Sequence, residues 1–137
     1  MTIKEKREFL SEYRNIQGRI AGLTNEITKW KTIGEKVNSA MSATGVMGGD
    51  NTSKVERSAV NTSDIIRDIQ KEIDAALEQR RAIIDAVQTK CKRMRYREVL
   101  EMHFINGMSI QKMARTYGKE DKTISNMITV AIKELNI

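Results

Sequence analysis

The sequence predicts an all-α protein in which a long, coiled-coil-like helical hairpin is followed by a C-terminal helix-turn-helix. Three observations predict this class. The 137 residues include no proline, 4% aromatic and 31% charged residues, a composition typical of long helices rather than sheets. Apolar residues near the start recur at alternating steps of four and three, as in a coiled coil. Near the end, a glycine separates two short amphipathic stretches and marks a tight helix crossing.

Residues 1–41 are expected to form the first helix. Its apolar stripe consists of Phe9, Tyr13, Ile16, Ile20, Leu23, Ile27 and Trp30. Gly18 and Gly22 lie inside the helix, and each costs about 1 kcal/mol of helix stability relative to alanine. We therefore expect this helix to need a partner. The simpler alternative is an ordinary amphipathic core helix without a coiled-coil seam.

Residues 42–62 are rich in glycine, serine and other small polar residues, and we expect them to form a flexible loop. The Gly48-Gly49 pair superficially resembles a phosphate-binding loop. The lysine that should follow in such a loop is missing, and no apolar strand precedes the pair. The segment is therefore interpreted as a connection between two helices.

A second long helix is expected over residues 63–94. Ser63 or Thr62 can cap its start, and Asp64 lies in the first turn, where the helix dipole favours a negative charge. Its stripe consists of Ile66, Ile69, Ile73, Ala76, Ile83 and Val87. The two stripes can pair within one chain, as an antiparallel hairpin, or between two chains, as a homodimer. Periodicity does not choose between these arrangements.

Residues 95–137 are expected to form a helix-turn-helix domain with helices over about 96–105, 109–117 and 121–135. Ser109 is placed to cap the middle helix. Gly118 ends that helix and can adopt a positive φ at little cost. The buried stripe of the last helix is expected to contain Ile124, Ile128 or Met127, Ala131, Ile132 and Leu135. Its opposite face then remains free to enter the major groove of DNA.

The basic residues concentrate in this C-terminal part. The net charge is +6, and residues 90–137 hold 10 Lys and Arg against 5 Asp and Glu. This excess is the footprint expected of a phosphate-binding surface, although a solvated basic face gives the same count. Asn can read adenine in the major groove, and Ser or Thr can contact bases or phosphates. The predicted contacts with double-stranded DNA are Arg95, Arg97, Lys112, Arg115, Lys119, Lys122, Thr123, Ser125, Asn126 and Thr129.

Nothing in the sequence favours an enzyme. His103 is the only histidine, and no motif supplies the partner that a catalytic base requires, so we interpret it as structural or surface-exposed. Cys91 is the only cysteine, which excludes an internal disulfide, and no spacing of metal ligands occurs. No catalytic residue, cofactor or metal is expected. The sequence contains no signal peptide or membrane-spanning run, which favours a cytoplasmic protein.

About the last forty residues closely resemble region four of bacterial sigma factors. The resembling elements are Val99-Leu100, the turn Asn106-Gly107-Met108-Ser109, the step Met113-Ala114, and Ile124 with Ala131-Ile132-Lys133-Glu134-Leu135. The whole layout is similar to that of small phage and prophage late-gene regulators of Gram-positive bacteria, of the ArpU and RinA types. The resemblance implies a sigma-like, DNA-binding transcription regulator of phage or prophage genes, with RNA polymerase as a further partner. The promoter-melting region two of sigma factors is missing.

Two alternatives remain open at this stage. Where sigma factors often carry arginines in the first turns of the reading helix, this chain has Asp121, Lys122 and Thr123, and Glu120 comes just before them. The two acids would repel phosphates, which leaves room for a protein that binds RNA polymerase or a sigma factor and has little specificity for bare DNA. The other alternative is a small terminase-like subunit that recognises DNA for packaging, because such subunits also join a helix-turn-helix to oligomerising helices.

Overall fold

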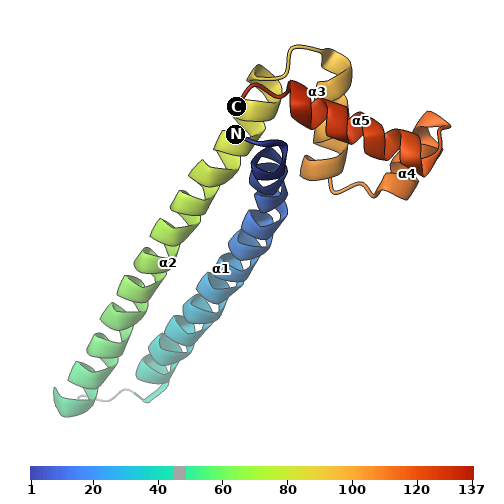
Figure 1. Ribbon diagram of the computed structural model, residues 1–137. Coiled ribbons are helices and arrows are strands. Elements are labelled where there is room, and N and C mark those ends of the chain that lie inside the picture. Colours follow the sequence, from blue (N-terminus) through green and yellow to red (C-terminus); the bar gives the residue numbers. More distant parts are fainter. Residues whose placement is uncertain (45–48) are drawn as a thin grey trace. The chain divides into compact units, whose positions relative to one another are not determined.

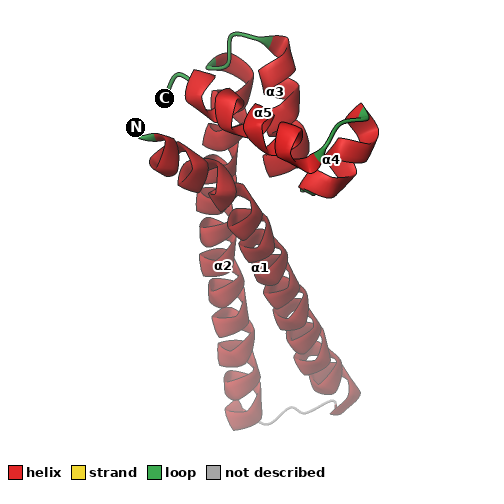
Figure 2. Cartoon of the chain, turned by 45° about the vertical axis from the view of Figure 1, so that its right-hand side comes forward, coloured by secondary structure: helices red, strands yellow, loops and turns green. Residues whose placement is uncertain are grey.

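The computed structural model describes residues 1–44 and 49–137, and the side chains of residues 1–37 and 61–137. Within those ranges every regular element is helical and no strand occurs, which confirms the all-α class (Figure 2). The elements are α1 (Ile3–Thr44), α2 (Gly49–Thr89), α3 (Met94–Leu100), a π-helical turn (Glu101–Ile105), α4 (Ile110–Tyr117) and α5 (Asp121–Glu134). None of the helices described combines the length and apolar character needed to cross a bilayer.

Where a part of α1 and a part of α2 belong to the same compact unit of the chain, the two parts run antiparallel (Figure 1). The chain divides into two compact units. One unit contains residues 1–18 together with residues 77–137, and the other contains residues 19–76. Each unit therefore holds a part of α1 paired with a part of α2.

The predicted start of the second helix near Ser63 is wrong, because α2 begins at Gly49. The predicted loop 42–62 is thus largely helical; only residues 45–48 lie outside the described part of the chain. The physical reason is visible in the sequence. No proline interrupts residues 49–62, and Val55, Ala59 and Thr62 continue the four- and three-residue spacing that leads into the stripe of α2. Glycine, serine and asparagine weaken a helix without ending it.

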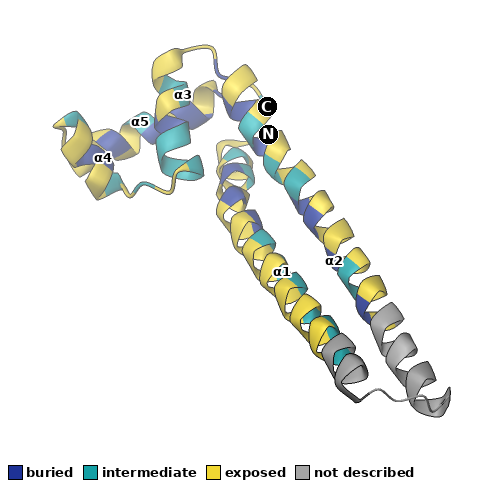
Figure 3. Cartoon of the chain, turned by 180° about the vertical axis from the view of Figure 1, so that it is seen from behind, coloured by how far each residue is buried: buried dark blue, intermediate teal, exposed yellow. Residues whose placement is uncertain are grey.

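In the unit formed by residues 19–76, burial is uneven between the two helices. Ile69, Ile73 and Ala76 of α2 are buried. The stripe of α1 is only half-buried in this unit, at Ile20, Leu23, Ile27 and Trp30. Two helices cover one side of each other, so the flanks of the stripe stay accessible (Figure 3).

The other unit has a closed core to which all five of the described α-helices contribute. Its fully buried side chains are Leu10 of α1, Val87 of α2, Val99 and Leu100 of α3, Met113 of α4, and Ile124, Ile128, Ile132 and Leu135 from α5 and its end. Helices α3 and α4 both pack against α5. Burying a side chain of this size contributes about 1.5–3 kcal/mol each, which is why the three short helices can be stable.

The segment between α2 and α3 is part of this core rather than a free linker. Cys91 is 1% exposed. The Asn136 amide donates to the Lys90 carbonyl at 2.9 Å, and Nη2 of Arg97 donates to the Cys91 carbonyl at 3.4 Å. These contacts fix α3–α5 to the last turn of α2.

Candidate nucleic-acid interface

The ends of α4 and α5 follow the local chemistry predicted from the sequence. Ser109 is the N-cap of α4, and its hydroxyl accepts the Lys112 amide at 3.1 Å. Gly118 ends α4 with φ 63° and ψ 39°, in the left-handed region that glycine adopts at little cost. Lys119 and Glu120 complete a short turn, and α5 begins at Asp121. The predicted bounds of these two helices are confirmed to within one residue.

Helix α5 divides into a buried face and a polar face. Ile124, Ile128, Ala131 and Ile132 are no more than 1% exposed. On the other side, Lys122, Thr123, Ser125 and Asn126 are exposed. Thr129 is half-buried, and its hydroxyl donates to the Ser125 carbonyl at 3.1 Å, one turn earlier. We call Lys122, Asn126 and Thr129, which are spaced four and three residues apart, the polar row of α5.

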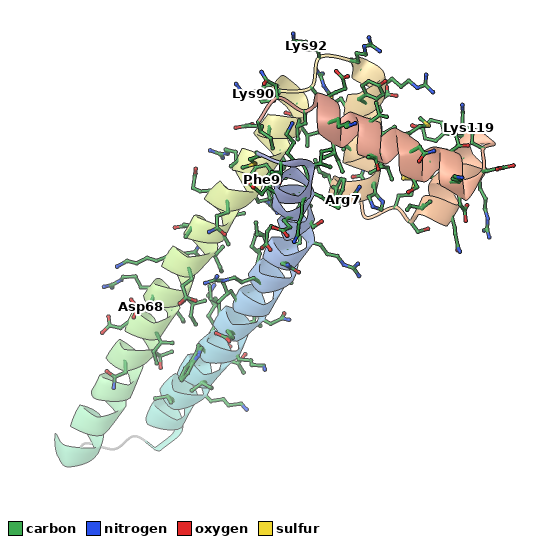
Figure 4. All side chains as sticks on the ribbon, in the orientation of Figure 1. Arg7, Phe9, Asp68, Lys90, Lys92 and Lys119 are labelled. Atoms are coloured by element: carbon green, nitrogen blue, oxygen red, sulfur yellow. The ribbon has the colours of Figure 1, made fainter. Side chains whose placement is uncertain are left out.

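Two basic side chains, Arg115 of α4 and Lys119 of the following turn, line an open hollow that reaches the first residue of α5. The hollow has a volume of about 410 Å³ and is lined by Gln111, Ala114, Arg115, Gly118, Lys119 and Asp121. Lys112, Arg115 and Lys119 are all exposed. Lys119 lies in the turn between α4 and α5 (Figure 4).

Charge pairing leaves these cations unneutralised. Among the described residues the ion pairs are Arg67–Asp64 and Arg81–Glu78, both on the surface of α2. None involves a residue of α3, α4 or α5. Glu120 and Asp121 lie at the N-terminal end of α5, where they interact favourably with the helix dipole instead of pairing with a lysine or arginine.

The two arginines predicted on α3 have different environments. Arg95 is exposed in the first turn of α3, so it is accessible to a phosphate. Arg97 is half-buried and bonded to the Cys91 carbonyl, and its Nε is buried without a hydrogen-bond partner. Arg97 thus holds the α2–α3 connection. Arg115 and Lys119, by contrast, line one hollow between α4 and the start of α5.

His103 has a structural role in the π-helical turn. Its Nδ1 lies 2.8 Å from the Met108 carbonyl, which can only accept, so Nδ1 donates. Its ring packs edge-on against Phe104 at a centroid distance of 4.8 Å. The π-helical turn ends at Ile105, and Asn106 and Gly107, the latter with φ 69°, follow it. Among the described residues, no group of three or more His, Cys, Asp or Glu side chains could hold a metal ion.

Two basic residues of α1 that the sequence pattern does not single out contact α5. Nζ of Lys6 donates to the carbonyls of Leu135 at 2.6 Å and Lys133 at 3.3 Å. Nη2 of Arg7 donates to Oγ1 of Thr129 at 3.3 Å, which brings a second basic side chain to the polar row of α5. No local pattern could reveal these contacts, because they join residues more than 120 positions apart.

No protein-family model, no curated protein and no solved structure matches this chain.

Proposed function

We propose that this protein is a sequence-specific DNA-binding transcription regulator that places α5 in the major groove. The observation that carries the proposal is the polar row of α5, which lies opposite a fully buried apolar face and beside unpaired cations. A helix about 10 Å across fits the major groove, and an exposed asparagine there can bond both polar edge atoms of adenine. In this proposal α4, the turn and α5 act as a helix-turn-helix.

Each predicted residue then has a defined task. Asn126 reads a base, and Thr123, Ser125 and Thr129 contact bases or nearby phosphates. Lys112, Arg115, Lys119 and Lys122 contact phosphates, with Arg95 farther along the backbone. Arg97 contributes by holding α3 in place, since its guanidinium is occupied by the Cys91 carbonyl. The resemblance to sigma region four supports a cytoplasmic, sigma-like regulator of phage or prophage genes.

The test is selection of duplexes from a random-sequence pool by the purified chain at near-physiological salt. The proposal expects one enriched motif. A two-fold repeat in it, with half-sites about one helical turn apart, would indicate a homodimer, for which the half-buried stripe of α1 offers a surface. Absence of any enriched motif, with binding that vanishes as salt rises, would contradict sequence-specific reading.

Substitution of Asn126 sharpens this test. Asn126→Ala removes a contact worth about 1–3 kcal/mol, so the affinity for the selected duplex should fall while the affinity for unrelated duplexes stays the same. Asn25→Ala is the matched control, because Asn25 is exposed on α1 and lies in the other unit. An Asn126→Ala protein with unchanged site preference would remove Asn126 from the reading surface.

One observation favours a second candidate function. Glu120 and Asp121 place two negative charges at the start of α5, where phosphates approach a reading helix. A protein that binds RNA polymerase or a sigma factor, and not bare DNA, tolerates these acids. If this is the function, the selection experiment should enrich no motif. The chain should instead co-sediment with purified RNA polymerase.

A further inference from the structure

The N-terminal turns of α1 lie against α5 in the same unit, through contacts that a core helix does not need. Lys6 caps the last carbonyls of α5, because its Nζ lies 2.6 Å from the Leu135 oxygen. The next residue, Arg7, is exposed and extends to Thr129 of the polar row. In Figure 4, Arg7 lies on the side of α1 turned toward α3–α5, whereas Phe9 lies on the side turned toward α2.

The Arg7 guanidinium lies next to the polar row of α5. Thr129 comes three residues after Asn126, and its hydroxyl donates to the Ser125 carbonyl. The Arg7 guanidinium is therefore placed at most one helical turn beyond the residues proposed to read bases. A duplex bound to the polar row would therefore contact Arg7 beside Thr129, the last residue of the row.

The charge of Arg7 remains available. Its hydrogen bond is to a neutral hydroxyl, and the guanidinium has five N–H donors. No carboxylate of the described residues lies within ion-pair distance of Arg7 or of Arg14. By contrast, Lys6 is engaged by two carbonyls that carry the negative end of the helix dipole.

Arg14 continues the same row of α1 beside a cleft. It lies seven residues after Arg7, nearly two turns and about 10 Å along the helix. The cleft, of about 540 Å³, separates α1 from the turn before α4, and its polar lining includes Ser11, Arg14, Gln17, His103, Asn106 and Ser109. Ser109 is the N-cap of α4, so Arg14 and the positive end of the α4 dipole border one space.

We propose that α1 forms a second part of the DNA interface, in which Arg7 and Arg14 bind backbone phosphates that flank the groove read by α5. The two residues lie about 10 Å apart along α1, a separation comparable with the width of about 12 Å of the major groove, which suits contacts with the two strands that border it. The inference rests on the proposed function of α5 and adds a contact surface from a distant part of the chain. These residues supply affinity without sequence information, because phosphates are the same in every sequence.

The test uses the full chain and compares Arg7→Gln, Arg14→Gln and the double variant with the natural sequence. Dissociation constants are measured for the selected duplex and for an unrelated duplex over a range of salt concentrations. Each variant should weaken both duplexes by the same factor and lower the slope of log K against log salt by about 0.9, and the double variant by about twice that. Arg7→Lys should retain the slope, because it retains the charge.

Arg19→Gln is the matched control, since it removes one exposed arginine of α1 that lies in the other unit. Circular dichroism and thermal unfolding confirm that each variant is folded. An unchanged salt slope in the double variant, with Asn126→Ala still abolishing site preference, overturns the role of α1 and leaves the function of α5 intact. Loss of affinity for the selected duplex alone would also overturn it, because it would mean base reading. If the natural chain binds no duplex, both proposals fail together.

Discussion

Nη2 of Arg7 lies 3.3 Å from Oγ1 of Thr129, a hydrogen bond between side chains 122 positions apart. It joins the first helix of the chain to the helix that carries the polar row. Because the bond links α1 to the proposed reading surface, its loss is measurable both in stability and in binding.

Thr129→Val removes the hydroxyl and keeps the shape of the side chain. The contact with Arg7 is largely exposed, so we expect a loss of up to about 1 kcal/mol in the free energy of unfolding, measured by urea titration. Thr116→Val is the control, because the Thr116 hydroxyl makes only the local bond to the carbonyl four residues earlier, that of Lys112. Equal costs for the two variants would show that the Arg7 contact contributes nothing.

Lys6→Met should destabilise the unit that contains α3–α5. The substitution removes the ammonium that satisfies the Leu135 and Lys133 carbonyls at the end of α5, while a similar apolar length is retained. Bonds to a charged group contribute about 1.5–3 kcal/mol when buried, and partial exposure reduces this to about 1 kcal/mol. Lys4→Met, at an exposed position of the same helix, should have little effect. A Lys6→Met protein as stable as Lys4→Met would contradict the capping role.

Two glycine substitutions should change stability in opposite directions. Gly118→Ala places a Cβ in the left-handed conformation at the end of α4 and should cost about 1–2 kcal/mol. Gly22→Ala lies within α1, where an added Cβ meets no other atom within 4 Å, and should stabilise the protein by about 0.5–1 kcal/mol. Thermal unfolding of the two proteins measures both signs. A neutral Gly118→Ala would mean that the turn relaxes to a different conformation.

Stability should fall at alkaline pH because of Cys91. Burial raises the pKa of the Cys91 thiol above its usual value of 9.0, and a backbone hydrogen bond to Arg93 and the nearby Arg97 only partly offset this. A raised pKa in the folded state means that the stabilisation is complete below the unfolded pKa and is lost as pH rises through the folded pKa. Urea titrations at pH 7.5 and pH 10 measure this loss. The free energy of unfolding of Cys91→Ala should fall less between the two pH values than that of the natural sequence. At neutral pH a thiol reagent should label Cys91 only as fast as the protein opens.

Locally determined features could be predicted from the sequence. Ser109 and Gly118 act through their own backbone and that of their neighbours, so the bounds of α4 and α5 followed from residue types alone. The start of α2 at Gly49 differs from the predicted start near Ser63 because the glycines and serines of residues 42–62 indicate a loop, whereas the apolar spacing continues through the helical part of that segment. Propensity is a weak signal, and a long paired helix overrides it.

Features that depend on distant residues could not be predicted. The π-helical turn at Glu101–Ile105 continues a helix expected to remain α-helical, and it is positioned by the packing of α3 and α4. The inward position of Arg97 depends on the carbonyl of Cys91 and on the buried surroundings of its Nε. The contacts of Lys6 and Arg7 depend on α5, more than 120 residues later.

The distance in sequence between Lys6 and Leu135 also sets the order of events during synthesis. Their contact spans 129 positions, so Leu135 is made after all the helices described. At about 5–20 residues per second, the first turns of α1 wait roughly 6–26 seconds for α5 to be made. During this interval Leu10, fully buried in the finished protein, lacks the later residues that complete the core of its unit. The nascent chain therefore exposes an apolar site to chaperones until α5 has been made, and the contacts of Lys6 and Arg7 with α5 form only after that point.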